Sequence, residues 1–319
     1  MSASWGLYER LCSLMPSEAG VEEFMLGLTW SLCRSSGPGG AGVGLAMSPG
    51  TATRTLSWPG SLAGRPVAEL AEWLFSWDPY DSTVAMSAVN SVINADSALM
   101  ASATPLFPRG EENLAVFEHF AARLRGKNVL VIGRYPGMDS LALDCKLRVL
   151  ERQPGPGDLP DPAAEYLLPE ADWVFLTATS IPNKTFPRLA ELSRDAKLVL
   201  MGPTVPWLED LAEYGVDYLA GVQVEDAAHL GRTVAEGGGT RIFGEGTRYA
   251  VLEMAANETD RLRQAIAAIV DRREALKEDM DAWYQADKRG RFPDWERLER
   301  LDQTLSELDS RFKLACDHA

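Results

Sequence analysis

The sequence has few of the residues that bind soft metals or nucleic acids. Its 319 residues include four cysteines and three histidines, and no two cysteines form a C-x-x-C pair. Dispersed cysteines argue against a disulfide framework and against a thiolate zinc site, and we interpret them as buried free thiols. Positive charge is also scarce, because 31 Lys and Arg residues face 46 Asp and Glu residues, a net charge of -15. We therefore expect neither nucleic acid nor an anionic membrane surface as a partner.

Long apolar runs and several catalytic signatures are missing as well. No run approaches the ~18 apolar residues of a membrane span, and residues 1–5 lack the basic start and apolar core of a signal peptide. We therefore expect a cytoplasmic protein. G-x-S-x-G, P-loop and H-E-x-x-H sequences are absent, which argues against the corresponding hydrolases, NTPases and metalloproteases. The apolar content of 46% is typical of a folded chain, and its length predicts more than one domain.

Five short apolar runs alternate with polar loops and helix-like segments in the middle of the chain. They lie at residues 129–133, 147–151, 173–177, 198–202 and 218–221. Near-continuous apolar strands that alternate with helices predict a parallel sheet covered on both faces, of the Rossmann-like type. In such a sheet the ligand lies beside the loops at the carboxyl ends of the strands.

The first strand ends in Gly133-Arg134-Tyr135, which differs from a dinucleotide-binding G-x-G-x-x-G sequence. The bulky Tyr135 argues against NAD or FAD, whereas Arg134 could be the counter-charge of a smaller anionic group. Glu151 ends the second strand, 18 positions after Gly133 (151 minus 133). This spacing is close to that of an acidic residue that binds a ribose hydroxyl, which keeps an adenosine ligand open as an alternative.

The loops after the third and fourth strands carry the densest group of hydroxyl and amide side chains. Fixed donors and acceptors at this edge of the sheet are well placed to orient a small polar ligand. The candidate ligand-binding residues are Thr177, Thr179, Asn183, Lys184, Thr185, Gly202, Pro203 and Thr204, together with Arg134 and Glu151. Thr185 could instead be a helix cap, and Asn183 a turn former.

Two adjacent carboxylates, Glu225 and Asp226, follow the fifth strand. Their oxygens could bind a hard cation, although acidic residues at this position also favour a helix dipole.

The first part of the chain predicts a small α+β domain. We expect helices at residues 5–14, 18–33, 66–75 and 82–100, and a β-hairpin that joins residues 43–47 to residues 53–58. Asn90 and Asn94 lie on one face of the last of these helices. Their amides could satisfy buried backbone groups, or this face could close over the ligand.

The last part of the chain predicts a helical hairpin. From residue 258 onward, apolar residues recur at alternating spacings of three and four in two series, and residues 288–293 form a turn between them. The hairpin could pack on the body, or it could mediate homodimerisation or docking of a partner protein.

Several ordered motifs resemble those of the family described as putative heavy-metal chelation domain. They are VLVIGRYP at 129–136, GDLPDP at 157–162, LPEAD at 168–172, NKT at 183–185, MGPTVP at 201–206, LAGVQVED at 219–226 and EGG at 236–238. The segment with GVGLA at 42–46 and Asn90 is similar to the enolase-N-terminal-like domain that precedes it. The resemblance implies a site in a cleft between the two domains, at Asn90, Glu151, Asn183, Thr185, Pro203 and Glu225. Ala178 stands where this family usually has Gly, and Arg134 is often another residue.

We therefore expect an α/β protein with an enolase-N-terminal-like α+β domain at residues 1–110, a Rossmann-like domain at 111–257 and a helical hairpin at 258–319. The predicted function is that of a small-molecule enzyme or binding protein linked to metal handling, with a divalent metal or metal chelate as the possible cofactor. An enzyme for adenosine ligands such as S-adenosylmethionine and a non-enzymatic partner protein acting through the hairpin are the alternatives.

Overall fold

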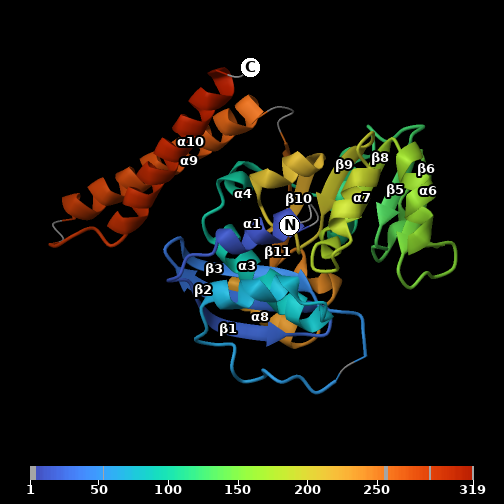
Figure 1. Ribbon diagram of the computed structural model, residues 1–319, viewed down its shortest axis with the longest axis horizontal. Coiled ribbons are helices and arrows are strands. Elements are labelled where there is room, and N and C mark those ends of the chain that lie inside the picture. The colour runs from blue at the N-terminus through green and yellow to red at the C-terminus, as the bar shows by residue number, and fades with distance from the viewer. Residues whose placement is uncertain (1–4, 53, 255–257, 287–288, 318–319) are drawn as a thin grey trace.

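The computed structural model describes residues 5–52, 54–254, 258–286 and 289–317. An eight-stranded sheet forms its centre, in the order β4-β11-β10-β9-β8-β5-β6-β7. A smaller three-stranded sheet and its helices precede the large sheet in the chain, and two long helices follow it (Figure 1). The predicted fold class, an α/β protein with a parallel-rich sheet, a small N-terminal unit and a C-terminal helical hairpin, is confirmed. None of the helices in the described ranges is long and apolar enough to cross a membrane.

Six strands of the large sheet run parallel and include all five predicted strands. They are β5 (Asn128–Ile132), β6 (Lys146–Glu151), β7 (Leu159–Pro160), β8 (Trp173–Thr177), β9 (Lys197–Met201) and β10 (Val216–Val224). Numbered along the chain, these strands have the spatial order 3-2-1-4-5-6 of a Rossmann fold. The order reverses between β5 and β8, and ligands bind such sheets at the carboxyl ends of the strands flanking this reversal.

Two further strands extend the sheet beyond β10 and were not predicted. β11 (Thr247–Glu253) pairs antiparallel with β10, and β4 (Thr104–Pro105) pairs antiparallel with β11. Side chains of the parallel strands alternate between two apolar layers, as in a strand buried on both faces. In β8, Val174 and Leu176 enter one layer, whereas Trp173 and Phe175 enter the other.

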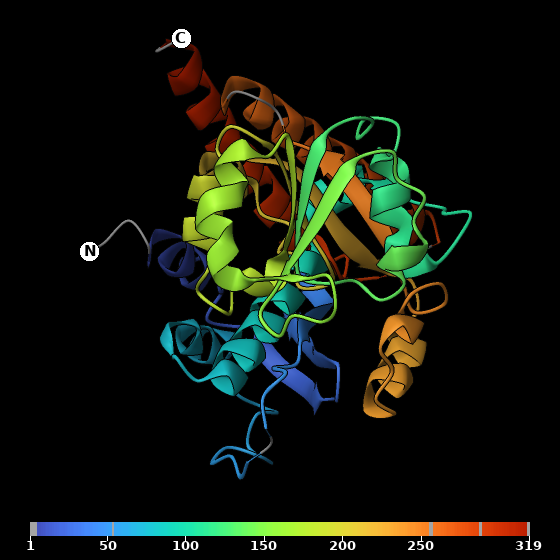
Figure 2. The same cartoon turned by 90° about the vertical axis from the view of Figure 1, so that its right-hand side faces the viewer.

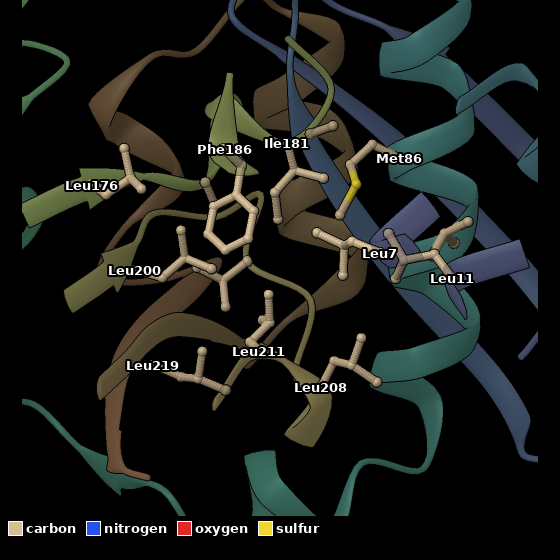
Figure 3. Close-up of a cluster of buried hydrophobic side chains, with 14 of the residues drawn as sticks. Leu7, Leu11, Met86, Leu176, Ile181, Phe186, Leu200, Leu208, Leu211 and Leu219 are labelled. Carbon is tan, nitrogen blue, oxygen red and sulfur yellow. The ribbon is translucent and has the colours of Figure 1, made fainter. Parts of the chain in front are cut away.

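The N-terminal unit packs against one of these layers. Leu7 and Leu11 of α1 (Gly6–Ser13) and Met86 of α3 (Pro79–Ala95) belong to the same buried cluster as Leu176 and Leu200 of the large sheet (Figure 3). In Figure 2 the blue and cyan N-terminal elements lie below the green and yellow strands. This shared apolar cluster fixes the N-terminal unit against the loops at one edge of the sheet.

The predicted helix at residues 18–33 is wrong. This segment forms the antiparallel strands β1 (Gly20–Leu26) and β2 (Trp30–Gly37). A register shift between Val21 and Glu23 breaks the alternation of apolar and polar residues that would have indicated a strand. Gly27 forms part of the turn, where a Cβ would lie 2.7 Å from the Trp30 carbonyl oxygen and 2.5 Å from that of Val234. Only glycine fits this turn without a shift of the backbone.

The predicted hairpin between residues 43–47 and 53–58 is wrong in its second strand. β3 (Gly40–Met47) pairs with β2, and residues 54–58 form no strand, while residue 53 lies outside the described residues. β3 lies directly against α3, because a Cβ on Gly44 would stand 2.1 Å from the carbonyl oxygen of Ser87. The small residues of both elements are therefore explained by close packing. The helix expected at 82–100 divides into α3 and α4 (Ala98–Ser102).

The remaining helices and turns cover the sheet or connect its strands. They are α2 (Val67–Ala71), η2 (Glu72–Phe75), η3 (Glu112–Leu114), α5 (Ala115–Phe120), η4 (Met138–Ser140), η5 (Asp161–Ala163), α6 (Ala164–Leu167), η6 (Leu168–Glu170), η7 (Ala178–Ser180), α7 (Phe186–Leu192), η8 (Glu209–Tyr214), α8 (Ala227–Ala235) and η9 (Thr240–Ile242).

The C-terminal hairpin consists of α9 (Glu258–Gln285) and α10 (Trp295–Asp317), which lie side by side and extend away from the sheet (Figure 1). Ile269, Leu276, Phe292 and Leu298 lie in its buried seam, which confirms the predicted helical pairing. Asp96 accepts hydrogen bonds from Arg272 and Arg297 and so attaches the hairpin to the end of α3. Some predictions fall on residues outside the described ranges. They concern residues 1–4, on which the expected absence of a signal peptide partly rests, and residues 287–288 and 318–319 of the predicted hairpin.

Candidate functional site

A cavity of about 750 Å³ lies where the carboxyl ends of β5, β6, β8 and β9 meet the N-terminal unit. The large sheet contributes the loops that begin at Gly133, Glu151, Thr177 and Gly202. The N-terminal unit contributes the β1–β2 turn at Thr29 and Trp30, the loop after β3 at 47–51, and Pro79 and Thr83 of α3. The cavity thus lies at the reversal of strand order, where Rossmann-like sheets bind ligands.

Two glycines allow the loops around this reversal to come close together. Gly133 has a φ of 93°, and a Cβ there would stand 3.0 Å from the methyl group of Thr177. Gly202 has a φ of 112°, and its Cβ would stand 3.4 Å from the hydroxyl of Tyr135. Burial raises the pKa of Tyr135, while a hydrogen bond with Thr177 opposes this shift. Tyr135 therefore contributes a protonated phenol to the cavity wall at the position where a dinucleotide fingerprint has glycine.

The charged groups after β5 and β6 are paired with one another. The guanidinium of Arg134 donates to Asp158 at 2.5 and 2.8 Å and to Asp139 at 3.1 Å. The Asp158 side chain is only 1% exposed, and the bonds from Arg134 hold its pKa below the usual range. Glu151 accepts from the backbone N–H of Arg134 at 2.8 Å and from that of Arg152 at 2.7 Å. Arg134 therefore is not a free counter-charge, although it lines the cavity as predicted.

The groups after β8 and β9 form a different environment. The hydroxyl of Thr177 donates to that of Thr179 at 3.1 Å and caps η7. The hydroxyls of Ser180 and of Tyr249, which comes from β11, are each in residues only 2% exposed. Within the described residues neither hydroxyl has a hydrogen-bond partner. Both residues line the cavity, and a ligand that draws either buried hydroxyl into a hydrogen bond would satisfy that group.

Lys184 lies in the loop between β8 and α7. Its Nζ donates to the hydroxyl of Ser82 on α3 and, at 3.0 Å, to the carbonyl oxygen of Pro182. Burial lowers the pKa of Lys184 to about 8, while the charge of Asp81 opposes this shift. Asn183 and Thr185 on either side also line the cavity. The loop thus brings a weakly basic amine to the cavity wall.

Asn90 lies behind the cavity wall rather than on it. It is fully buried, and its amide donates to the carbonyl oxygens of Leu45 at 2.9 Å and of Thr204 at 3.0 Å. The hydroxyl of Thr204 accepts from the backbone N–H of Met47 at 3.0 Å. These bonds join β3, α3 and the loop after β9. Asn90 and Thr204 thus connect the two units, and Gly202, Pro203 and Thr204 line the cavity as part of that loop.

Glu225 and Asp226 lie outside the cavity and have other partners. Glu225 accepts two hydrogen bonds from Arg248, at 2.6 and 3.0 Å, and Asp226 caps α8 by accepting from the backbone N–H of Ala228 and His229. In the described ranges no three His, Cys, Asp or Glu side chains form a group that could hold a metal ion. Burial raises the pKa of Cys12 and of Cys33 to about 12, so these thiols are protonated near neutral pH. The donor set therefore does not fit a heavy metal bound directly by side chains.

Ten of the candidate residues, Thr204 included, line one cavity. The aromatic side chains in the same wall were not predicted. Trp30, Phe243 and Tyr249 line the cavity, and the rings of Phe243 and Tyr249 stack with their centroids 4.9 Å apart. Tyr249 lies on the unpredicted strand β11 and Trp30 on a segment expected to be helical. No signal in the sequence placed either residue beside the predicted loops.

Comparisons with known proteins identify the family of this chain. A family model described as putative heavy-metal chelation (DUF364) matches residues 115–253, and a second model with the same description (DUF4213) matches residues 8–93. The chain is 31% identical to a protein of unknown function of the first family from Desulfitobacterium hafniense DCB-2, with a TM-score of 0.67, and the match covers 78% of this chain and 98% of that one.

A second structure, of a protein of unknown function from Pyrococcus horikoshii, is 20% identical, with a TM-score of 0.61 and the same coverage of 78% and 98%. It supports the fold alone. The comparison with curated proteins found no match. Both family matches end before α9 begins at Glu258.

Proposed function

Because this chain belongs to the family described as putative heavy-metal chelation, we propose that it is a small-molecule enzyme or binding protein linked to metal handling. Its ligand is a polar organic molecule bound in the cavity between the N-terminal unit and the large sheet. The observation that carries this proposal is the pair of unpartnered buried hydroxyls, Ser180 and Tyr249, on the cavity wall. A buried polar group without a partner costs about 1–3 kcal/mol, which a ligand atom in hydrogen-bond contact offsets.

The composition of the wall supports an organic ligand and not a bare metal ion. Hydroxyls, one amine and the aromatic rings of Trp30 and Phe243 face the cavity. These groups bind the polar and planar parts of an organic molecule, whereas heavy metals prefer thiolate and imidazole ligands. A metal that reaches this protein is therefore held by the ligand, as a metal chelate.

Native mass spectrometry with elemental analysis of the freshly purified protein tests this proposal, because it measures ligand, metal and stoichiometry together. We expect a small organic molecule, with metal at no more than the stoichiometry of that molecule. Tyr249→Phe removes only the unpartnered hydroxyl and weakens binding about tenfold, the equivalent of ~1.4 kcal/mol. Tyr166→Phe, on a side chain that is 78% exposed, is the matched control. Metal that stays bound after the organic molecule is removed contradicts the proposal.

An adenosine-containing ligand such as S-adenosylmethionine is the second candidate. Glu151 favours it, because this carboxylate ends β6 beside the β5 loop and lines the cavity. Both of its oxygens already accept backbone N–H groups, which weakens the case for a ribose contact. Calorimetry with adenosine, S-adenosylmethionine and NAD distinguishes the candidates, since an absence of heat for all three eliminates this one.

A further inference from the structure

Lys184 has a backbone conformation that lysine rarely adopts. Its φ is 63°, and in the described part of the chain no other residue besides glycine has a positive φ. A side chain in this sparsely populated backbone conformation is energetically unfavourable, and such residues cluster at functional sites. The loop between β8 and α7 therefore holds Lys184 at the cavity wall despite strain.

The amine of Lys184 has only uncharged hydrogen-bond partners in the described structure. Its two acceptors, the Ser82 hydroxyl and the Pro182 carbonyl oxygen, are both uncharged. An ammonium group has three N–H donors, whereas a neutral amine has two and a lone pair. The remaining tetrahedral position of Nζ has no partner among the residues that the structure describes. Lys184 lines the cavity, whereas Ser82 is fully buried behind the cavity wall.

The other cations on the cavity wall have carboxylate partners. The pairs are Arg134 with Asp158, Arg152 with Asp161, and Arg188 with Glu165. Lys184 has no such pair in the described structure, and its pKa of about 8 leaves a substantial neutral fraction near pH 7.5. An ordinary lysine, with a pKa near ~10.4, is almost wholly protonated at that pH. Lys184 is thus equipped to act as a nucleophile where an arginine could only bind charge.

Resting on the function proposed above, we propose that Lys184 forms an imine with the carbonyl group of a small aldehyde or ketone bound in the cavity. The lone pair of Nζ attacks the carbonyl carbon, and the carbonyl oxygen takes up a proton to give a carbinolamine. The carbon–oxygen bond then breaks, and the hydroxyl leaves as water with a proton from the nitrogen. A C=N double bond remains, and no oxidant or reductant is consumed.

Reductive methylation with formaldehyde and cyanoborohydride tests this chemistry, because a formaldehyde imine must form on a neutral amine before the hydride reduces it. The full-length protein is treated at pH 7 with limiting formaldehyde, and methylation of each lysine is followed by peptide mass spectrometry. We expect Lys184 to react at least ~10-fold faster than Lys197, since one pKa unit changes the neutral fraction tenfold. Lys197 is the matched control, because its ion pair with Asp217 at 2.7 Å raises its pKa.

Two variants keep the test independent of folding. Lys184→Arg retains the positive charge but forms no imine. The rapid methylation expected of Lys184, called the fast phase, therefore disappears in this variant, whereas Lys197→Arg leaves that phase intact. Thermal unfolding shows that each variant is folded, and Lys184→Met replaces Lys184→Arg if the latter is not. Methylation of Lys184 no faster than of Lys197, or an unchanged fast phase in Lys184→Arg, overturns the proposal. A ligand found by native mass spectrometry beside an unreactive Lys184 contradicts the imine alone and leaves the proposed function standing.

Discussion

The two ends of the cavity differ in how their polar groups are partnered. After β5 and β6, Arg134, Glu151 and Asp158 form a closed set of hydrogen bonds. After β8, the Ser180 hydroxyl has no partner in the described structure, and the Lys184 amine has only neutral ones. Charged residues therefore do not identify the ligand contacts in this cavity. The charged end braces the cavity, and the less charged end holds the groups that are free to bind.

The largest effect is expected from breaking the brace. Arg134→Met leaves the Asp158 carboxylate, 1% exposed, without its cation and lowers the free energy of unfolding by about 2 kcal/mol. Urea denaturation monitored by circular dichroism measures this change. Arg188→Met is the control, because its pair with Glu165 is about half exposed on both sides and is screened by solvent, so a much smaller effect is expected. Equal effects of the two variants would show that the end after β5 and β6 is not a structural brace.

Lys184→Met is expected to change stability in the opposite direction. The free energy of unfolding should rise by on the order of 1 kcal/mol at pH 7, a value that is reduced because the amine is partly exposed. The folded-state pKa of Lys184, about 8, lies below the ordinary value of 10.5. Between these values the unfolded chain binds more protons, so wild-type stability rises with pH in that window. The advantage of the variant is therefore complete below pH 8 and declines toward pH 10.5. A pH series of thermal unfolding measures it, and a loss of stability at pH 7 would contradict the lowered pKa.

Tyr249→Phe is expected to have the smallest effect on stability. The free energy of unfolding should stay the same or rise by no more than about 1 kcal/mol. The hydroxyl that it removes has no partner in the described protein, so no hydrogen bond is broken. Calorimetric unfolding of the ligand-free protein measures the difference. A destabilisation above ~2 kcal/mol would mean that the hydroxyl contributes to the fold and not to ligand binding.

The sequence predicts the large sheet better than it predicts the partners within the site. Continuous apolar runs identify β5, β6, β8, β9 and β10, because strands buried on both faces consist mostly of apolar residues. Their carboxyl-end loops follow from topology alone.

Partners across long separations escape such reasoning. Arg134 and Asp158 are 24 residues apart, on two irregular loops, and no periodic pattern connects them. Tyr249 reaches the cavity through β11, which lies between β4 and β10 and follows a glycine-rich segment, so the sequence offers no sign of its place. In the N-terminal unit, the irregular register of β1 hides the strand pattern. The functionally decisive contacts thus depend on tertiary packing, which local sequence patterns do not record.

A crystal structure of the protein with the ligand identified by native mass spectrometry shows directly whether the groups after β8 and on β11 bind that ligand. We expect a polar ligand atom within ~2.6–3.2 Å of the Tyr249 hydroxyl, with the ligand extending toward Lys184 and the Arg134–Asp158 pair unchanged. A ligand held by Arg134 and Glu151 alone, with Asp158 displaced and the Tyr249 hydroxyl still unpartnered, would contradict it.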